Sequence, residues 1–494
     1  MQLIPNKIPI KVGTKYICIL NEKTAHMLDL HASDRIYIKN GTKGNVNAIL
    51  DITEDNKEIK DNEIGLYIET WEKLKTKRGD RVNVKIAEKP ESILFIKDKL
   101  DGKVLNAQQI NAIIKDVVED DLTDVEISYF VAGCYTNGLS IKETVDLTKA
   151  IVNNGGRLHF NKKIVLDKHC IGGVPGNRTT LIVVPIITAL GLTMPKTSSR
   201  AITSPSGTAD TMEVLANVTN ERNKLQKIAE KINGFITWGG GVDLAAADDR
   251  MIRARHPLSL DPQGMLLASI MAKKNSVSAT HVLIDIPIGK QVKVKDKKAA
   301  ESLGEKFKTI GKLLGMKVEI LISNGDQPIG FGIGPVLEAM DVMKVLKNEK
   351  NAPQDLRAKA LKMASILLEL CGKAKKGQGL KMAEDTLKSG KAYDQLMRII
   401  KEQGPTNRKL RPGKFSKAVL ATKNGTVKEI DNKLIAHVAR IAGAPKDPES
   451  GVIINKKLND KVKKGDILYT IYADMKDRLN YVDDIGLDKV YTIK

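Results

Sequence analysis

The sequence predicts a multidomain protein that combines α/β and α+β architecture, and three observations lead to this prediction. The chain has 494 residues, which is enough for two or three domains with hydrophobic cores of their own. Near the N-terminus the apolar residues alternate as they do in strands, whereas from about residue 94 they follow the period of a helix. From residue 164 onward, strand-like and helix-like segments follow one another, which is typical of an α/β domain.

Residues 1–88 are expected to form a small β-rich N-terminal domain. The segments predicted to be strands are 8–12, 16–20, 35–38 and 82–86. The last two alternate apolar and polar residues, as half-buried strands do.

A helical domain is expected over residues 94–160. Three pairs have the spacing of a capping box, in which two side chains close the first turn of a helix: Asn106 with Gln109, Thr123 with Glu126, and Ser140 with Glu143. Residues 245–277 are assigned to the same domain because their pattern is largely helical. The helical domain is thus expected to be built from two separate parts of the chain.

Residues 161–244 and 278–415 are expected to form the α/β domain, and residues 416–494 a C-terminal α+β domain. In the α/β domain, strands are predicted at 164–166, 280–286 and 318–322, with a helix over 298–314. In the C-terminal region, Gly425, Gly451 and Gly465 each open a unit made of a turn and a strand.

The composition limits the classes of protein that the chain can belong to. Hydrophobic residues make up 42% and charged residues 28%, as in ordinary globular proteins. No uninterrupted apolar run reaches the roughly 18 residues of a transmembrane helix, and no secretion signal is recognised, so we expect a cytoplasmic protein without a membrane partner. The four cysteines, Cys18, Cys134, Cys170 and Cys371, are too far apart for a metal knuckle. No metal site is predicted.

The net charge of +21 raises the alternative of a nucleic-acid-binding protein. However, lysines are interleaved with acidic residues, and no basic run carries aromatic residues that could stack on bases. We therefore predict no nucleic-acid partner. A positively charged protein also attracts small anionic substrates.

A glycine-rich segment, residues 167–180, follows a predicted strand and leads into a helix. Its backbone N–H groups and the helix N-terminus could hold a phosphate. Lys168 and Arg178 would add positive charge, and Thr179 and Thr180 would add hydroxyl groups. A purely structural tight turn is the alternative, because glycine-rich turns are common.

Two further segments are rich in groups that bind phosphate or ribose. Residues 195–208 carry seven hydroxyl side chains around Arg200, although a polar surface loop would look similar. In residues 253–274, Asp261 could cap the following helix, and the four-residue spacing of Ser269 and Lys273 puts both on one helix face.

Taken in order, these segments resemble the thymidine phosphorylase family of nucleoside phosphorylases. The family's Lys-His-Ser-Thr-Gly-Gly pattern is similar to residues 168–173, and its serine- and glycine-rich loop is similar to residues 198–208 in a variant form. That variant, with the extra N-terminal domain, resembles an archaeal branch that acts on nucleoside 5′-monophosphates, mainly AMP but also CMP and UMP. The resemblance implies a cleft between the helical and α/β domains.

The resemblance also implies roles for individual residues. Asp261 would be the catalytic proton donor. Inorganic phosphate would be held by Lys168, Thr179, Thr180, Ser198 and Thr208. The nucleotide would be contacted by Gly173, Ser199, Arg200, Ala201, Ile202, Thr203, Ser204, Thr208, Ser269 and Lys293, with Arg200 and the neighbouring hydroxyl groups as candidates for its 5′-phosphate. His169 and Lys273 are possible further site residues, and His169 could equally be structural.

One departure leaves the base preference open. The thymidine enzymes carry an arginine shortly before the Ser269-like position, whereas here Ala254 stands at that spacing between Arg253 and Arg255. A pyrimidine-nucleoside phosphorylase is therefore the alternative within the same class. In either case the resemblance implies inorganic phosphate as a co-substrate, no cofactor, and a homodimer that assembles into a higher homo-oligomer.

Overall fold

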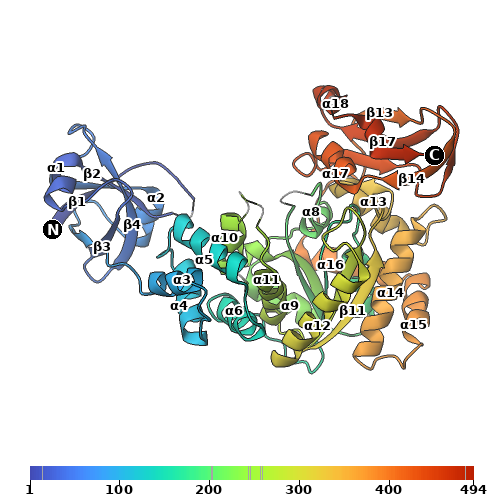
Figure 1. Ribbon diagram of the computed structural model, residues 1–494, viewed down its shortest axis with the longest axis horizontal. Helices are drawn as coiled ribbons and strands as arrows, with labels where there is room; N and C mark the ends of the chain where they lie inside the picture. The colour runs from blue at the N-terminus through green and yellow to red at the C-terminus, as the bar shows by residue number, and fades with distance from the viewer. Residues whose placement is uncertain are drawn as a thin grey trace. The chain divides into compact units, whose positions relative to one another are not determined.

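The computed structural model describes residues 1–13, 15–201, 204–242, 244, 246–255, 258, 260–483 and 485–494, without the side chains of residues 246 and 483. The chain divides into two compact units, which are described separately below. The first unit is Met1–Ala150 with Arg250–Gln263, and the second is Ile151–Asp249 with Gly264–Lys494. Figure 1 labels many of the helices and strands and colours the chain from its N-terminus in blue to its C-terminus in red.

The first unit begins with a closed six-stranded barrel. Its strands are β1 (Gln2–Lys7), β2 (Ile17–Asn21), β3 (Arg35–Asn40), β4 (Gly44–Thr53), β5 (Glu63–Leu66) and β6 (Val82–Ile86), with the short helices α1 (Glu22–Met27) and α2 (Ile68–Lys73). In β3, Ile36 and Ile38 are fully buried in the barrel core while their neighbours are more exposed. The prediction of a β-rich N-terminal part is confirmed.

The predicted strand over residues 8–12 is wrong. The first strand is β1, which ends at Lys7, and residues 9–12 are exposed. Pro9 has no N–H group to donate to a neighbouring strand, and exposed side chains give this segment no face to bury. The apolar residues Ile10 and Val12 are therefore surface residues.

Helices follow the barrel, and all three predicted capping boxes are present. The helices are α3 (Ser92–Leu100), α4 (Ala107–Val118), α5 (Asp124–Asn137), α6 (Ile141–Asn153), α10 (Ala246–Arg255) and α11 (Gln263–Ser276). Side chains and backbone N–H groups bond reciprocally in the pairs Asn106–Gln109, Thr123–Glu126 and Ser140–Glu143. The unit boundary falls within α6, α10 and α11.

The second unit is built on parallel strands. β7 (Leu166–Cys170), β10 (His281–Ile288) and β11 (Lys317–Asn324) form one parallel sheet in the order β11-β10-β7. β8 (Met194–Ser198) and β9 (Gly234–Trp238) form a parallel pair, and a parallel bridge between Val165 and Thr193 links it to the sheet beside β7. The predicted strands at 280–286 and 318–322 are confirmed.

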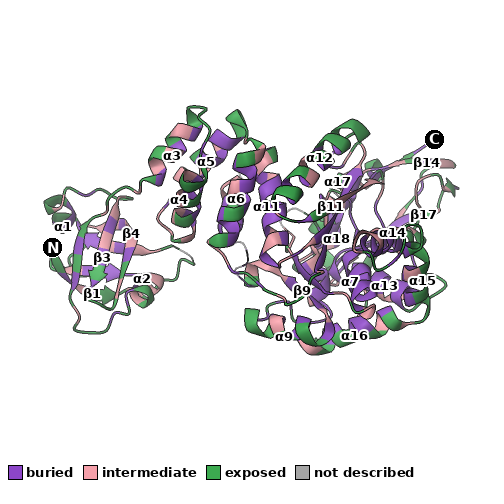
Figure 2. Ribbon diagram, turned by 90° about the horizontal axis from the view of Figure 1, so that it is seen from below, coloured by how far each residue is buried: buried purple, intermediate pink, exposed green. Residues whose placement is uncertain are grey.

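Helices pack against these strands. They are α7 (Thr180–Ala189), α8 (Thr208–Glu213), α9 (Arg222–Ile232), α12 (Lys297–Leu313), α13 (Pro335–Leu346), α14 (Gln354–Leu370), α15 (Gly379–Lys388) and α16 (Lys391–Gln403). The predicted helix at 298–314 corresponds to α12. α7 is apolar on all sides and almost wholly buried, as its purple ribbon in Figure 2 shows. It is therefore a core helix.

The C-terminal part is α+β, as predicted. Its strands are β12 (Gly332–Ile333), β13 (Phe415–Leu420), β14 (Gly425–Ile430), β15 (Gly451–Ile454), β16 (Lys461–Val462), β17 (Ile467–Ala473) and β18 (Tyr491–Ile493), with the helices α17 (Asn432–Ile441) and α18 (Lys476–Asp483). They form sheets in the orders β12-β15-β17-β13 and β16-β14-β18. Short 3₁₀ turns lie at Gly239–Gly241 and Leu487–Val490. Every helix in the described part of the chain is too short or too polar to cross a membrane.

A buried ion pair in the helical part allows a stability prediction. Lys99 Nζ lies 2.8 Å from Glu143 Oε1, and both side chains are only 2% exposed. Lys99→Met would leave the carboxylate buried without its counter-ion, so we expect a loss of about 3 kcal/mol in the free energy of unfolding. Calorimetry or urea unfolding measures this loss.

The exposed pair of Lys142 and Asp146 provides the matched control, because the Lys142 side chain is 75% exposed. Lys142→Met should change the unfolding free energy by no more than about 0.5 kcal/mol. Equal losses in the two variants would show that burial does not govern the Lys99 pair.

Candidate functional site

The glycine-rich segment forms a tight connection between β7 and α7. The strand was expected to end at residue 166, but β7 runs from Leu166 to Cys170 because it stays paired in parallel with β10 over that length. Lys168 and His169 therefore lie in the strand itself, not in the loop. Gly173 and Gly176 follow with φ of +92° and +72°, a conformation that favours glycine. A side chain at Gly176 would also collide with the carbonyl oxygen of Ile329.

A cavity of about 290 Å³ opens beside this connection. The cationic side chains that line it are Lys168, Arg178, Lys196, Arg200, Lys273 and Lys274. Its hydroxyl-bearing residues are Thr180, Thr197, Ser198, Ser199, Ser204, Ser206 and Thr208. Among the residues that the structure describes, no aspartate or glutamate lines it. Such a lining is suited to an anion with several oxygen atoms, such as phosphate.

A buried aspartate behind the cavity holds two of the lysines. The Asp167 side chain is fully buried and forms ion pairs with Lys274 and, at 3.5 Å, with Lys196. Burial lowers the pKa of Lys274 to about 7 and also lowers the pKa of Lys196. These three residues could not be given a role from local motifs. Their charges in or next to apolar strands and helices were a usable signal, because lysine and aspartate are almost never fully buried unless paired.

Two residues predicted to bind phosphate, Lys168 and Ser198, have polar groups that could bond to a ligand. Lys168 Nζ donates to Thr179 Oγ1 at 2.7 Å, and no carboxylate in the described part of the chain lies within 4.0 Å of it. Burial lowers the pKa of Lys168 to about 8. Ser198 Oγ is buried and has no hydrogen-bond partner among the described residues. Because an unsatisfied buried hydroxyl costs free energy, a bound anion that accepts from Ser198 and Lys168 would stabilise this wall.

The hydroxyl-rich loop is fastened to the start of α8. The Asp210 carboxylate accepts from the backbone N–H groups of Ala201 and Gly207, both at 2.7 Å. Arg200 forms ion pairs with Glu213 and Asp210. Arg200 is therefore already neutralised by protein carboxylates. Of the predicted nucleotide contacts, Ile202 and Thr203 lie outside the described residues.

Arg178 is held by a second buried carboxylate. Its Nε atom forms an ion pair with Glu338 and donates to Thr211 Oγ1 at 3.0 Å. Burial raises the pKa of Glu338 to about 7, while Arg178 opposes that rise. Glu338 was not identified from the sequence, because α13 lies more than a hundred residues away from the loop that it supports.

Ser269 and Lys273 share one face of α11, as their spacing predicted. Ser269 Oγ donates to Asp248 Oδ2 at 2.7 Å, and Lys273 Nζ lies 2.8 Å from the same oxygen. Lys273 lines the cavity.

Burial and the surrounding lysines lower the pKa of His169 well below its usual value. This imidazole is therefore neutral at pH 7.

Asp261 and Lys293, two further predicted residues, are also absent from the lining of this cavity. Asp261 belongs to the first unit, where its Oδ1 atom lies 3.2 Å from Arg255 and its side chain is 38% exposed. Lys293 lies in the loop that follows β10 and lines a second cavity of the second unit.

The carboxylates of Asp116, Glu119 and Asp121 come within 4.8 Å of one another in the first unit. Acidic groups of this kind are common on protein surfaces, and we assign them no ligand.

Three domain families match the chain. The helical bundle domain of a glycosyl transferase family matches residues 94–155, and the a/b domain of that family matches residues 162–393. The pyrimidine nucleoside phosphorylase C-terminal domain matches residues 426–493. Among solved structures, anthranilate phosphoribosyltransferase from Thermus thermophilus is similar to this chain, with a TM-score of 0.53 and 16% identity over 62% of this chain and 98% of the other. That likeness concerns the fold alone.

Similarity to whole proteins extends over nearly the full length. An AMP phosphorylase of Methanococcus maripaludis is 42% identical over 480 residues, which cover 96% of this chain and 94% of the relative. An AMP phosphorylase of Methanococcoides burtonii is 41% identical and covers 97% of this chain and 94% of the relative.

The charge of Lys168 yields a pH prediction for anion binding. Lys168 carries its proton below pH about 8, so sulfate, which stays a dianion throughout this range, should bind best there. Above that pH, the dissociation constant for sulfate should rise by up to about tenfold per pH unit, because each binding event must recover one proton. Calorimetric titrations between about pH 6.5 and 9.5 measure this profile.

Lys168→Arg is the matched variant, because arginine keeps its charge over the whole range. Its sulfate affinity should stay nearly constant between about pH 8 and 9.5. The same fall in affinity with rising pH in the variant would assign the titration to another group.

Proposed function

Because the chain belongs to the AMP phosphorylases of the thymidine phosphorylase family, we propose that it cleaves nucleoside 5′-monophosphates with inorganic phosphate. The products from AMP are adenine and ribose 1,5-bisphosphate, and CMP and UMP are further substrates. The observation that carries the proposal is the identity of 42% to an AMP phosphorylase over 96% of the chain. The cavity lined by cations and hydroxyl groups, without a carboxylate among its described residues, supports it chemically.

In this proposal, inorganic phosphate binds to Lys168, Ser198 and Thr208, with help from Thr180. All four residues line the cavity. Thr179 takes part by holding the Lys168 ammonium group at 2.7 Å. Lysine and hydroxyl donors neutralise a dianion and fix its orientation, which leaves one oxygen free to attack C1′ of the ribose.

The nucleotide contacts follow the family pattern: Gly173, residues 199–204, Thr208, Ser269 and Lys293. Gly173 suits this role because it lines the cavity shortly after the end of β7 and has no side chain. Ser269 and Lys273 would act as a unit, because both are bound to Asp248. His169, neutral at pH 7, would offer a hydrogen bond without adding charge.

The reaction breaks the bond between C1′ and the base nitrogen and forms a bond between C1′ and a phosphate oxygen. The electron pair of the broken bond leaves with the base, and a proton delivered to the base makes it a neutral leaving group. We assign this proton to Asp261.

The proposal includes the expected cleft between the helical and α/β domains. Exclusion of water from the reacting atoms would prevent hydrolysis from competing with phosphorolysis.

Phosphate is a co-substrate, and the reaction needs no redox or group-carrying cofactor. The proposal also includes a homodimer as the basic assembly, with a higher homo-oligomer built from it.

The first experiment measures adenine released from AMP by chromatography, with and without phosphate. We expect release that requires phosphate, together with formation of ribose 1,5-bisphosphate. Parallel reactions with adenosine and with thymidine provide the controls. Release from nucleosides alone would support the pyrimidine-nucleoside alternative, and no phosphate-dependent release from any of these compounds would refute the proposed reaction.

Asp261→Asn tests the proton donor. The amide keeps the size of the side chain but cannot give up a proton, so kcat for AMP should fall by about a hundredfold or more, while the dissociation constant for AMP stays within about twofold. Single-turnover rates and calorimetry measure the two quantities. Normal turnover in the variant would exclude Asp261 as the acid.

A further inference from the structure

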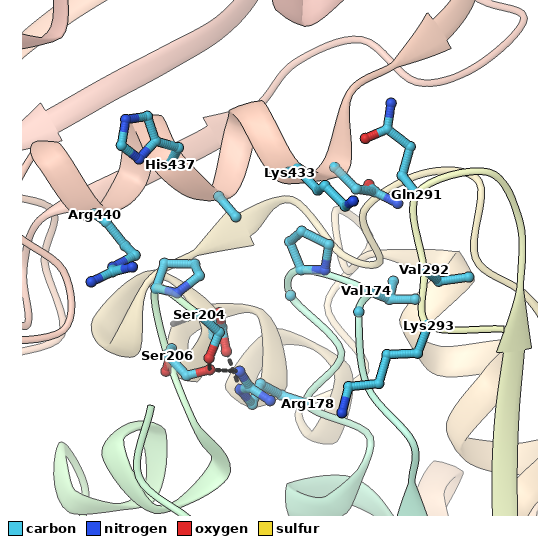
Figure 3. A pocket seen from close by; sticks show the side chains of 17 residues that line it. Val174, Arg178, Ser204, Ser206, Gln291, Val292, Lys293, Lys433, His437 and Arg440 are labelled. Atoms are coloured by element: carbon cyan, nitrogen blue, oxygen red, sulfur yellow. Dashed lines mark hydrogen bonds and ion pairs between the residues drawn. The ribbon is translucent and has the colours of Figure 1, made fainter. Parts of the chain in front are cut away.

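A second cavity, of about 510 Å³, adjoins the first within the same unit. The two cavities share Gly173, Arg178, Ser204 and Ser206 as lining residues. The opposite side of the second cavity is formed by α17 of the C-terminal part, from which Lys433, His437 and Arg440 are labelled in Figure 3. A molecule bound in the first cavity can therefore extend along the shared residues toward α17.

The second cavity is also positively charged. Lys433, His437 and Arg440 are spaced four and three residues apart, so they lie along one face of α17. In Figure 3, the Lys293 side chain comes from the other side and extends toward Arg178. Among the described residues, the only acidic side chain in the lining is Glu338, which is paired with Arg178.

The start of α17 offers both a cation and an acceptor to a ligand. No carboxylate of the described residues lies within 4.0 Å of Lys433 Nζ, and Lys433 is an exposed residue. Next to it, Asn432 is 1% exposed and its Oδ1 atom has no hydrogen-bond partner among the described residues. Asn432 is one of the residues that line the cavity, and a ribose hydroxyl is a donor that a nucleotide would bring to its side chain.

The two proposed ligands occupy the cavities differently. Lys168, Ser198 and Thr208, assigned to inorganic phosphate, line only the first cavity. The residues assigned to the nucleotide extend further: Ser199, Arg200 and Thr208 line the first cavity, Gly173 and Ser204 line both, and Lys293 lines the second. The nucleotide therefore reaches into the second cavity, where its own anionic group has to be neutralised.

We propose that α17 forms the wall that receives the 5′-phosphate of the nucleotide, with Lys433 and Arg440 as its principal cations. This inference rests on the proposed function and specifies how a nucleotide is distinguished from a nucleoside. It places the 5′-phosphate at α17 and not at Arg200, which does not line the second cavity. The C-terminal part thereby becomes part of the substrate site.

The variants Lys433→Gln and Arg440→Gln test the inference. Removal of one charged hydrogen-bond donor should raise the KM for AMP by about tenfold, while the KM for phosphate stays unchanged. Calorimetry without phosphate should show AMP binding weakened by a similar factor and adenosine binding unaffected. Lys428→Gln is the matched control, because Lys428 is an exposed lysine of the same part of the chain and lines neither cavity.

The outcomes separate this inference from the proposed reaction. Unchanged AMP binding in both variants, or an equal loss of AMP and adenosine binding, would overturn the role of α17. A rise in the KM for phosphate with AMP binding intact would also overturn it. If the wild-type protein releases no base, the proposed reaction fails, but the comparison of AMP with adenosine by calorimetry still decides whether α17 binds the 5′-phosphate.

Discussion

The structure of the site depends on keeping positive charges inside the protein without neutralising all of them. Asp167 is fully buried and balances Lys196 and Lys274 from behind the cavity, whereas Lys168 donates to the hydroxyl of Thr179 and has no carboxylate within 4.0 Å among the described residues. Charges in such surroundings are costly unless they are compensated. The depressed lysine pKa values express this cost, and a bound dianion would remove it. An anion bound in this cavity should therefore raise the stability of the folded protein.

The parallel sheet explains why these charges meet. Lys168 lies in β7 and Lys196 in β8, and the bridge between Val165 and Thr193 shows that the two strands run side by side in parallel. The carboxyl ends of parallel strands open at the same edge of a sheet, and ligands bind outside that edge. The connection from β7 to α7 and the loop after β8 start from this edge. Residues far apart in the chain thus form one cavity.

Local patterns in the sequence were enough to predict the parts of this structure that local interactions determine. The capping boxes depend on side chains three residues apart, and the face shared by Ser269 and Lys273 depends on the helical repeat, so both could be predicted. The end of β7 depends on its pairing with β10, more than a hundred residues away, and the predicted strand end was therefore too early. The ion pairs of Arg178 with Glu338 and of Asp167 with Lys274 are equally distant in sequence, and no local pattern indicates them. The loop around Arg200 was predicted by composition, but its carboxylate partners lie in α8, which the sequence pattern did not single out.

Part of the net charge of +21 comes from cations that line the two cavities. Six cationic side chains surround the first cavity, and further ones, including Lys293, Lys433 and Arg440, line the second. An enzyme that takes up inorganic phosphate and a nucleotide must bring two dianions close together, which costs electrostatic energy in proportion to the inverse of their separation. A single lysine could not offset this repulsion. Cations distributed over two adjoining cavities can hold each dianion separately and still allow the phosphate oxygen to approach C1′. Under the proposed function, the lysines and arginines that line the two cavities serve to bring two dianionic substrates together, in addition to attracting them.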